Sequence, residues 1–201
     1  MSSRATQKQQ SRERILEAAG RHLRTGGIDG AGIAAVMSEA GLTHGAFYAH
    51  FSNKDELTRN ALVHALEQNR ARWLGKPQRE SWTQRLGRLA RRYLTGAHRQ
   101  SRADSCALAA LCSEAARGDS AFRRTYEEEL LKSLSGLCEG PFETQPPQRG
   151  DDALAYMALL VGTLALSRAV ASPALAERLL KAGADAAARI GHADPEQRAN
   201  R

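Results

Sequence analysis

The sequence predicts an all-α protein of about nine helices, with an N-terminal domain of about three short helices and a larger C-terminal helical domain. Apolar residues recur at the 3.6-residue spacing of amphipathic helices along most of the chain. Helix caps, glycines and prolines separate these segments, and no stretch alternates in the manner of a strand. A chain of 201 residues is long enough for a small domain packed on a larger one.

The N-terminal domain is expected at residues 11–58, after a polar, flexible arm of residues 1–10. Ser11 is the predicted cap of a first helix that ends near Arg24, because Gly26 and Gly27 follow it. The other two helices of this domain are expected at Ile33–Ala40 and Thr43–His50.

The stretch GLTHGAFYAHFSNKDEL, residues 41–57, predicts a glycine turn, a helix of about two turns and the capped start of a longer helix. On a helical wheel, Ala46, Phe47 and His50 fall on one side. The residues that fall on the other side are Thr43, His44, Gly45, Tyr48 and Ala49. A short helix that buries one side and offers imidazole and phenol groups on the other is suited to the DNA major groove.

The C-terminal domain is expected at residues 59–190, followed by a disordered tail at 191–201. Glycines, prolines and caps delimit its helices, and residues 139–150 form a proline-rich loop. Including the helix that links the domains, the expected helices are 53–73, Trp82–His98, Ala103–Arg117, 120–137, Asp151–Ala171 and 172–190.

Composition indicates a soluble cytoplasmic protein with a polyanionic partner. The net charge is +7, and the excess lies at residues 61–102, which carry 10 Lys and Arg against 2 Asp and Glu. The N-terminus lacks the apolar core of a secretory signal, and the apolar run Ala153–Ser167 is too short to span a bilayer. The 3 cysteines have neither disulfide-framework nor metal-ligand spacing, so we expect no metal and no cofactor.

Residues 41–57 resemble the N-terminal signature of the TetR/AcrR family of transcriptional regulators. The match is specific, because about ten residue types recur at fixed spacing, and it extends roughly over residues 11–60. The resemblance implies an all-helical homodimer that binds a palindromic operator and is released by a small molecule. It also implies a non-enzymatic protein, most often a repressor, located at the nucleoid. The matching residues are Gly41-Leu42-Thr43, Gly45, Phe47-Tyr48, His50-Phe51, Asn53-Lys54 and Glu56-Leu57.

The resemblance assigns DNA contact to Thr43, His44, Gly45, Tyr48, His50 and Lys54. Lys54 opposes the dipole at a helix start, which a phosphate contact would explain. His50 is turned partly inward, so a packed side chain and a phosphate contact are both open readings. The preceding helix departs from the family pattern at Gly32, Ala34 and Met37, which should weaken its anchoring to DNA.

The resemblance also implies an effector cavity and dimerisation through the last two helices, about residues 151–190. An apolar small molecule with a few polar anchors is the expected effector. Aromatic residues at helical spacing are also typical of plain core. The candidates for the cavity lining are Trp73, Trp82, Tyr93, Cys106, Phe122, Tyr126 and Met157.

Cys106 is a candidate redox or electrophile sensor. We expect it in the first turn of its helix, beside Arg102, where both features would favour the thiolate. The alternative reading is a small buried residue. A rival function from another class is a cysteine-based switch or enzyme in which DNA binding is secondary, although no His or Asp partner is recognisably placed around a cysteine.

Arginines at 85, 88, 91, 92 and 99 are expected on the outer face of the helix Trp82–His98. This pattern is typical of a solvated face. An anionic effector or a second nucleic-acid contact is the open alternative.

Overall fold

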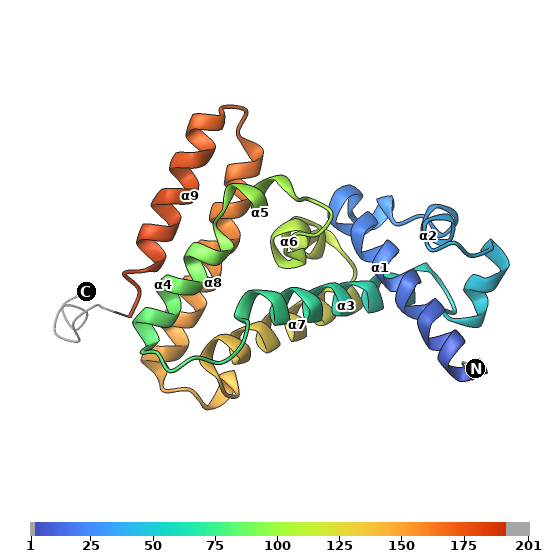
Figure 1. Ribbon diagram of the computed structural model, residues 1–201, viewed down its shortest axis with the longest axis horizontal. Coiled ribbons are helices and arrows are strands. Elements are labelled where there is room, and N and C mark those ends of the chain that lie inside the picture. The colour runs from blue at the N-terminus through green and yellow to red at the C-terminus, as the bar shows by residue number, and fades with distance from the viewer. Residues whose placement is uncertain (1–2, 192–201) are drawn as a thin grey trace. The chain divides into compact units, whose positions relative to one another are not determined.

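The computed structural model describes residues 3–191, and all regular secondary structure in that range is helical (Figure 1). The described chain holds nine α-helices and two short 3₁₀ helices, η1 and η2, which confirms the predicted fold class. It forms two compact units: residues up to Asn69 with Arg102–Glu129, and Arg70–Ser101 with the chain from Leu130 onward. These units differ from the expected domains 11–58 and 59–190, because the first unit also contains a later part of the chain.

Helix α1 spans Arg4–Gly30, so the prediction of a flexible arm before Ser11 is wrong over residues 4–10. The Ser3 hydroxyl caps the helix by accepting a hydrogen bond from Thr6 N at 3.2 Å. No glycine or proline interrupts residues 4–14, so the helix can extend through this segment although the segment has no apolar pattern. The predicted break at the glycine pair is present as a kink, since Gly27 has φ 70°.

The first unit packs α2 (Ile33–Glu39), η1 (His44–Ala49), the first part of α3 (Lys54–Leu74), α6 (Ala107–Arg117) and the first part of α7 (Ser120–Cys138) with α1. Its core contains large side chains with less than 2 % exposure, among them Ile15, Leu23, Phe47, Leu57 and Leu62.

Helix α6 packs on α1, and two polar contacts join α1 to α6 and to the segment before it. Ile28 N donates to Glu114 Oε2 at 3.3 Å, and Arg24 Nε donates to Ala103 O. Both contacts lie near the kink of α1, so α6 supports the chain where it turns toward α2.

The second unit contains the α4 (Trp82–Tyr93) and α5 (Gly96–Gln100) helices where one helix was expected. The prediction of a single helix over Trp82–His98 is therefore wrong. Thr95 ends the first helix and caps the second, because its hydroxyl accepts a hydrogen bond from His98 N at 3.1 Å.

Helices α8 (Pro147–Ala169) and α9 (Pro173–Ala187) pack against each other in the second unit. Ser172 caps α9, as predicted, by accepting from Leu175 N at 3.3 Å. The expected loop at 139–150 is wrong in part, since η2 covers Phe142–Thr144 and α8 begins at Pro147. Proline suits the first helical position because its missing N–H has no partner there.

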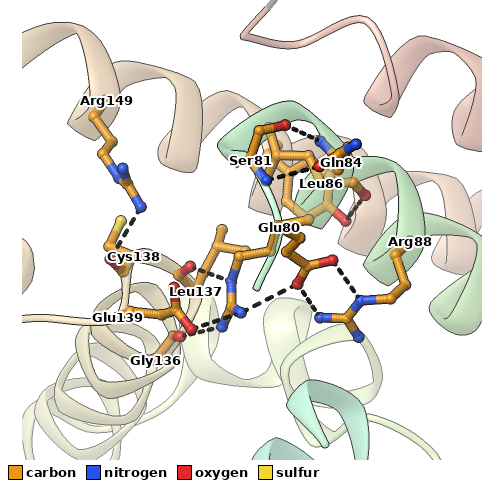
Figure 2. Close-up of polar contacts among 12 residues, drawn as sticks. Glu80, Ser81, Gln84, Leu86, Arg88, Gly136, Leu137, Cys138, Glu139 and Arg149 are labelled. Carbon is orange, nitrogen blue, oxygen red and sulfur yellow. Dashed lines mark hydrogen bonds and ion pairs between the residues drawn. The ribbon is translucent and has the colours of Figure 1, made fainter. Parts of the chain in front are cut away.

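Three of the five arginines expected on a solvated face are buried or half-buried instead, so this prediction is wrong for them. Arg85 is 5 % exposed and donates to Leu137 O at 2.9 Å and Gly136 O at 3.1 Å (Figure 2). Arg88 forms a bidentate pair with Glu80 at 2.9 and 2.5 Å, and this pair lowers the pKa of the carboxylate. Arg99 Nε donates to Ser167 O at 2.7 Å.

Helix α8 is long and apolar enough to cross a membrane by length and composition alone, a property that it shares with buried core helices of soluble proteins. Its buried side chains include Ala153, Tyr156, Leu160 and Leu164. Tyr156 is fully buried, and its hydroxyl donates to Leu86 O of α4 at 2.7 Å. Packing against α4 and α9 accounts for the apolar composition of this helix.

Of the expected disordered tail, only Gly191 lies within the described residues, and it occupies a turn.

Candidate nucleic-acid interface

The turn between α2 and η1 is closed by backbone hydrogen bonds around Gly41. Gly41 N donates to Ser38 O at 3.1 Å, and Leu42 N donates to Met37 O at 2.9 Å. Gly41 has φ 65°, in the left-handed region where a side chain is disfavoured. The glycine therefore makes the sharp corner that separates the two short helices.

The exposed and buried faces of η1 are those predicted from the sequence. Phe47 is fully buried, whereas Tyr48 is 66 % exposed. Ala46 is half-buried, and the remaining outward residues are Thr43, His44, Gly45 and Ala49. Phe47 thus anchors the element while its polar side chains face solvent.

The element is a 3₁₀ helix and not the expected α-helix of two turns. His50 N and Phe51 N both donate to Phe47 O, at 2.9 and 3.0 Å, which tightens the end of the helix. Thr43 occupies the N-cap position, but its side chain makes no cap hydrogen bond. The hydroxyl of Thr43 therefore keeps its capacity for an outside partner.

The exposed aromatic groups of η1 are held by one another and by the core. The rings of Phe47 and Tyr48 are in a T-shaped arrangement with centroids 5.2 Å apart. Tyr48 and His44 are also T-shaped, at 6.4 Å. These contacts restrain the phenol and the imidazole on the outward face.

Helix α3 begins with Lys54 and is capped by Asn53. Asn53 Oδ1 accepts from Glu56 N at 2.8 Å, while Glu56 Oε2 accepts from Ser52 N at 2.7 Å. The hydrogen bonds from Ser52 lower the pKa of Glu56. Lys54 Nζ lies 4.0 Å from Oδ1 of Asp29, whose side chain is fully exposed. The lysine is thus placed at a helix N-terminus with only a weak partner.

His50 lies between the exposed face and the core. Its residue is half-buried, and among the described residues its Nδ1 atom is buried without a hydrogen-bond partner. Burial lowers the pKa of the imidazole, and the charges of Lys8 and Arg12 lower it further. The role of Arg12 was missed from the sequence: its guanidinium lies 5.1 Å from the centroid of the Phe51 ring.

The candidates for an effector cavity divide between the two units. Cys106, Phe122 and Tyr126 belong to the first unit, and Trp73, Trp82, Tyr93 and Met157 belong to the second. In the second, the rings of Trp73 and Tyr93 lie 5.9 Å apart, and those of Tyr93 and His98 lie 4.6 Å apart. Arg149 lies over the Trp82 ring at 4.3 Å.

Cys106 precedes α6 as its N-cap, so its expected place in the first turn is wrong. It is buried, whereas Cys112 is exposed. Both thiols lie near Tyr126, whose phenol donates to Leu108 O at 2.8 Å. Burial raises the pKa of this phenol, and the two cysteines raise it further. Across residues 3–191, no group of three or more His, Cys, Asp and Glu residues is placed to hold a metal ion.

The arrangement of α2, the glycine turn and η1 is that of a helix-turn-helix protein, with an anchored helix presenting polar side chains to a groove. Residues 15–61 match the model of the family described as bacterial regulatory proteins, tetR family. No curated protein matches the chain.

Solved structures similar to the whole chain carry the same fold. A TetR transcriptional regulator from Chloroflexus aurantiacus is 19% identical, with a TM-score of 0.72, covering 90% of this chain and 94% of its own. A TetR-family regulator from Cytophaga hutchinsonii is 18% identical, with a TM-score of 0.70 and coverages of 92% and 96%. A transcriptional regulator from Rhodococcus sp. Rha1 is 25% identical, with a TM-score of 0.68 and coverages of 88% and 93%.

Residues 15–61 are therefore a TetR-family helix-turn-helix, which is a DNA-binding element, and the chain as a whole has the fold of TetR-family regulators.

Proposed function

We propose that this protein is a ligand-responsive repressor that binds a palindromic operator as a homodimer. The observation that carries the proposal is the orientation of η1, in which Phe47 is fully buried while Tyr48 is 66 % exposed beside His44. Phenol and imidazole groups can donate and accept hydrogen bonds at base edges, and Lys54 at the start of α3 suits a phosphate.

Dimerisation through α8 and α9 is supported by the apolar side chains on their outer faces. Leu154 and Leu166 of α8 are 47% and 58% exposed, and Leu175 of α9 is 43% exposed. Exposed apolar area of this kind is typical of an interface. In the proposed dimer, these helices form a four-helix bundle with their symmetry mates and hold two η1 elements roughly 34–36 Å apart, one turn of DNA.

Release by a small molecule is supported by the aromatic residues of the second unit. Trp73, Tyr93 and His98 form a chain of T-shaped contacts, which offers an apolar lining with polar tips. The dimer can adopt conformations that differ in the spacing of its two DNA-binding elements. A ligand that binds one of these conformations more tightly raises the population of that conformation. The proposed ligand favours a spacing that DNA does not accept.

Gel-shift titration against the DNA upstream of the protein's own gene tests the proposal. We expect a sequence-specific shift that weakens strongly with salt and that involves two chains per operator. A chain that stays monomeric at all concentrations, or that shifts every DNA equally, would contradict it. The proposed cellular location is the cytoplasm, at the nucleoid.

Gly45→Ala gives a matched test of groove contact. A Cβ added at Gly45 meets nothing within 4 Å, so the fold itself tolerates the substitution. Gly26→Ala, at another helical position where the added Cβ meets nothing within 4 Å, is the control. We expect both variants to keep the melting temperature, and only Gly45→Ala to weaken operator binding. Equal DNA binding by the two variants would argue against close approach at this position.

A further inference from the structure

The N-terminal turns of α1 carry a row of basic residues, Arg4, Lys8 and Arg12, which we call the basic stripe. Residues four apart are neighbours on one side of a helix, turned by only about 40° from each other. At a rise of 1.5 Å per residue, the stripe runs for about 12 Å along the helix. The sequence alone placed most of this segment in a flexible arm, so the stripe emerges only from the helix that the structure shows.

The stripe faces the part of the chain that links η1 to α3. Arg12 Nη2 donates to Asn60 Oδ1 of α3 at 2.8 Å, and the same guanidinium lies 5.1 Å from the Phe51 ring centroid. Lys8 lies one helical turn earlier, and its charge reaches the imidazole of His50. Lys8 and Arg12 therefore lie near His50, which directly follows η1, and Arg4 extends the stripe by one further helical turn.

Protein carboxylates do not neutralise the outer part of the stripe. Arg4 and Lys8 are exposed, and within the described residues neither forms an ion pair. The one acidic residue in this segment, Glu13, accepts a hydrogen bond from Gln9 at 3.0 Å. Like charges one turn apart destabilise a helix by a few tenths of a kcal/mol. A polyanion alongside the helix would reverse the sign of this contribution.

We infer that the basic stripe binds the DNA backbone next to the groove that η1 enters. The contact extends the interface beyond the residues that match the family model, which begin at residue 15. Lys8 and Arg4 bind phosphates, while Arg12 fixes the direction of the helix through Phe51 and Asn60. His50, the C-cap of η1, feels the charges of Lys8 and Arg12, and its Nδ1 atom is buried without a hydrogen-bond partner in the described chain. The inference rests on the proposed DNA binding and names a second contact surface for it.

The paired substitution Arg4→Gln with Lys8→Gln tests the stripe. Glutamine keeps the helix propensity and removes both charges, and Arg12 is retained because it packs on Phe51. The matched control is Arg91→Gln with Arg92→Gln, which removes two exposed arginines of α4 in the second unit. Affinity for the operator and for unrelated DNA of equal length is measured by fluorescence anisotropy over a range of salt concentrations.

We expect the stripe variant to bind both DNAs several-fold more weakly. The salt slope of log K should fall by about 3.6, which is roughly 0.9 for each of the four phosphate contacts that a dimer loses. The control variant should keep the wild-type slope, and both variants should keep the wild-type circular dichroism. The stripe variant could keep the wild-type affinity and salt slope, or both variants could lose affinity equally. Either result would overturn DNA contact by the basic stripe while leaving the proposed operator binding intact. Absence of binding by the wild-type protein would instead overturn the proposed function together with the stripe.

Discussion

Arg85 Nη1 lies 2.9 Å from Oε1 of Glu139. Within the described residues, Glu139 is the non-glycine residue with a positive φ, at 61°. The same guanidinium donates to the carbonyl oxygens of Gly136 and Leu137 at the end of α7 (Figure 2). A side chain of α4 thus satisfies carbonyls that a helix end leaves without partners. The pair also holds Glu139 in the left-handed turn that follows α7.

Arg85→Met should destabilise the protein strongly. The substitution keeps an aliphatic stem but leaves buried carbonyls and the nearly buried Glu80 with fewer partners. Breaking a buried ion pair on one side costs about 3–5 kcal/mol, and chemical denaturation should show a loss of that order. A midpoint within error of wild type would mean that water or a relaxed chain replaces the guanidinium.

Glu139→Gly is the informative control for this network. The Glu139 side chain is 47% exposed, so the loss of its ion pair should cost at most about 1 kcal/mol. Glycine removes the left-handed strain, which is worth about 1–2 kcal/mol, so the net change should be small or stabilising. Glu139→Ala loses the pair and keeps the strain, and it should be the less stable of the two variants.

Gly183→Ala should weaken the packing of α8 on α9. A Cβ at this position would lie 2.5 Å from two side-chain atoms of Thr163. Overpacking of a close contact costs about 1–3 kcal/mol, and thermal unfolding should report the loss. Gly162→Ala, on α8 with nothing within 4 Å of the added Cβ, should instead be neutral or stabilising by up to about 1 kcal/mol. Equal effects of the two substitutions would contradict the close approach at Gly183.

The elements that the sequence predicted well are those with a local signal. Ser172 and Pro173 start α9, and Gly41 makes the corner before η1, because a cap or a left-handed turn depends on neighbouring residues only. The faces of η1 followed from periodicity, since one large apolar side chain, Phe47, fixes which side is inward.

The features that the sequence missed depend on distant partners or weak local signals. The local sequence predicts an outward side chain for Arg85. The carbonyl groups to which it donates lie 51 and 52 positions further along the chain, so no local pattern indicates them. The first turns of α1 have no apolar period, so their helical state depends on the Ser3 cap and intrinsic propensity. The segment Trp82–His98 forms two helices because of Thr95, although its apolar spacing is that of one continuous helix. The capping hydrogen bond of the Thr95 side chain competes with the helical hydrogen bonds there.

The stability of the protein should depend on pH through His98. Burial lowers the pKa of this imidazole from 6.5, the charges of Arg168 and Arg72 lower it further, and the bond to Tyr93 O at 2.7 Å opposes the shift. Because the folded pKa lies below the unfolded one, the unfolded chain binds more protons between the two values, and stability rises with pH there. The contribution is complete above about pH 6.5 and is lost as pH falls toward the folded pKa.

His98→Asn should flatten this pH dependence. Asparagine keeps a donor for Tyr93 O and does not titrate. Urea unfolding of the variant and the wild type should be compared at several pH values from about 5 to 8, the range over which an imidazole titrates. The wild-type slope below pH 6.5 should exceed that of the variant. Identical slopes would show that His98 has the same pKa in the folded and unfolded states.

The DNA-binding residues should separate into two classes when operator sequence is varied. His44→Ala and Tyr48→Ala remove exposed groups from η1 while Phe47 keeps the element anchored. If these groups contact base edges, each loss should cost about 1–3 kcal/mol at the operator and change the ranking of single base-pair variants. Lys54→Ala removes a charge at the start of α3, so binding should weaken similarly on all sequences, and the salt slope should fall by about 1 for each subunit of the dimer.

Anisotropy titrations against a set of single base-pair operator variants at two salt concentrations distinguish these classes. Tyr48 gives the sharper result, because its 66 % exposed ring is not required by the core, so a folded variant is expected. If Tyr48→Ala lowered affinity by the same factor on every sequence, the phenol would be a backbone contact and base readout would fall to His44 and its neighbours. If Lys54→Ala changed the sequence ranking, the ammonium would reach a base edge, and α3 would enter the groove together with η1.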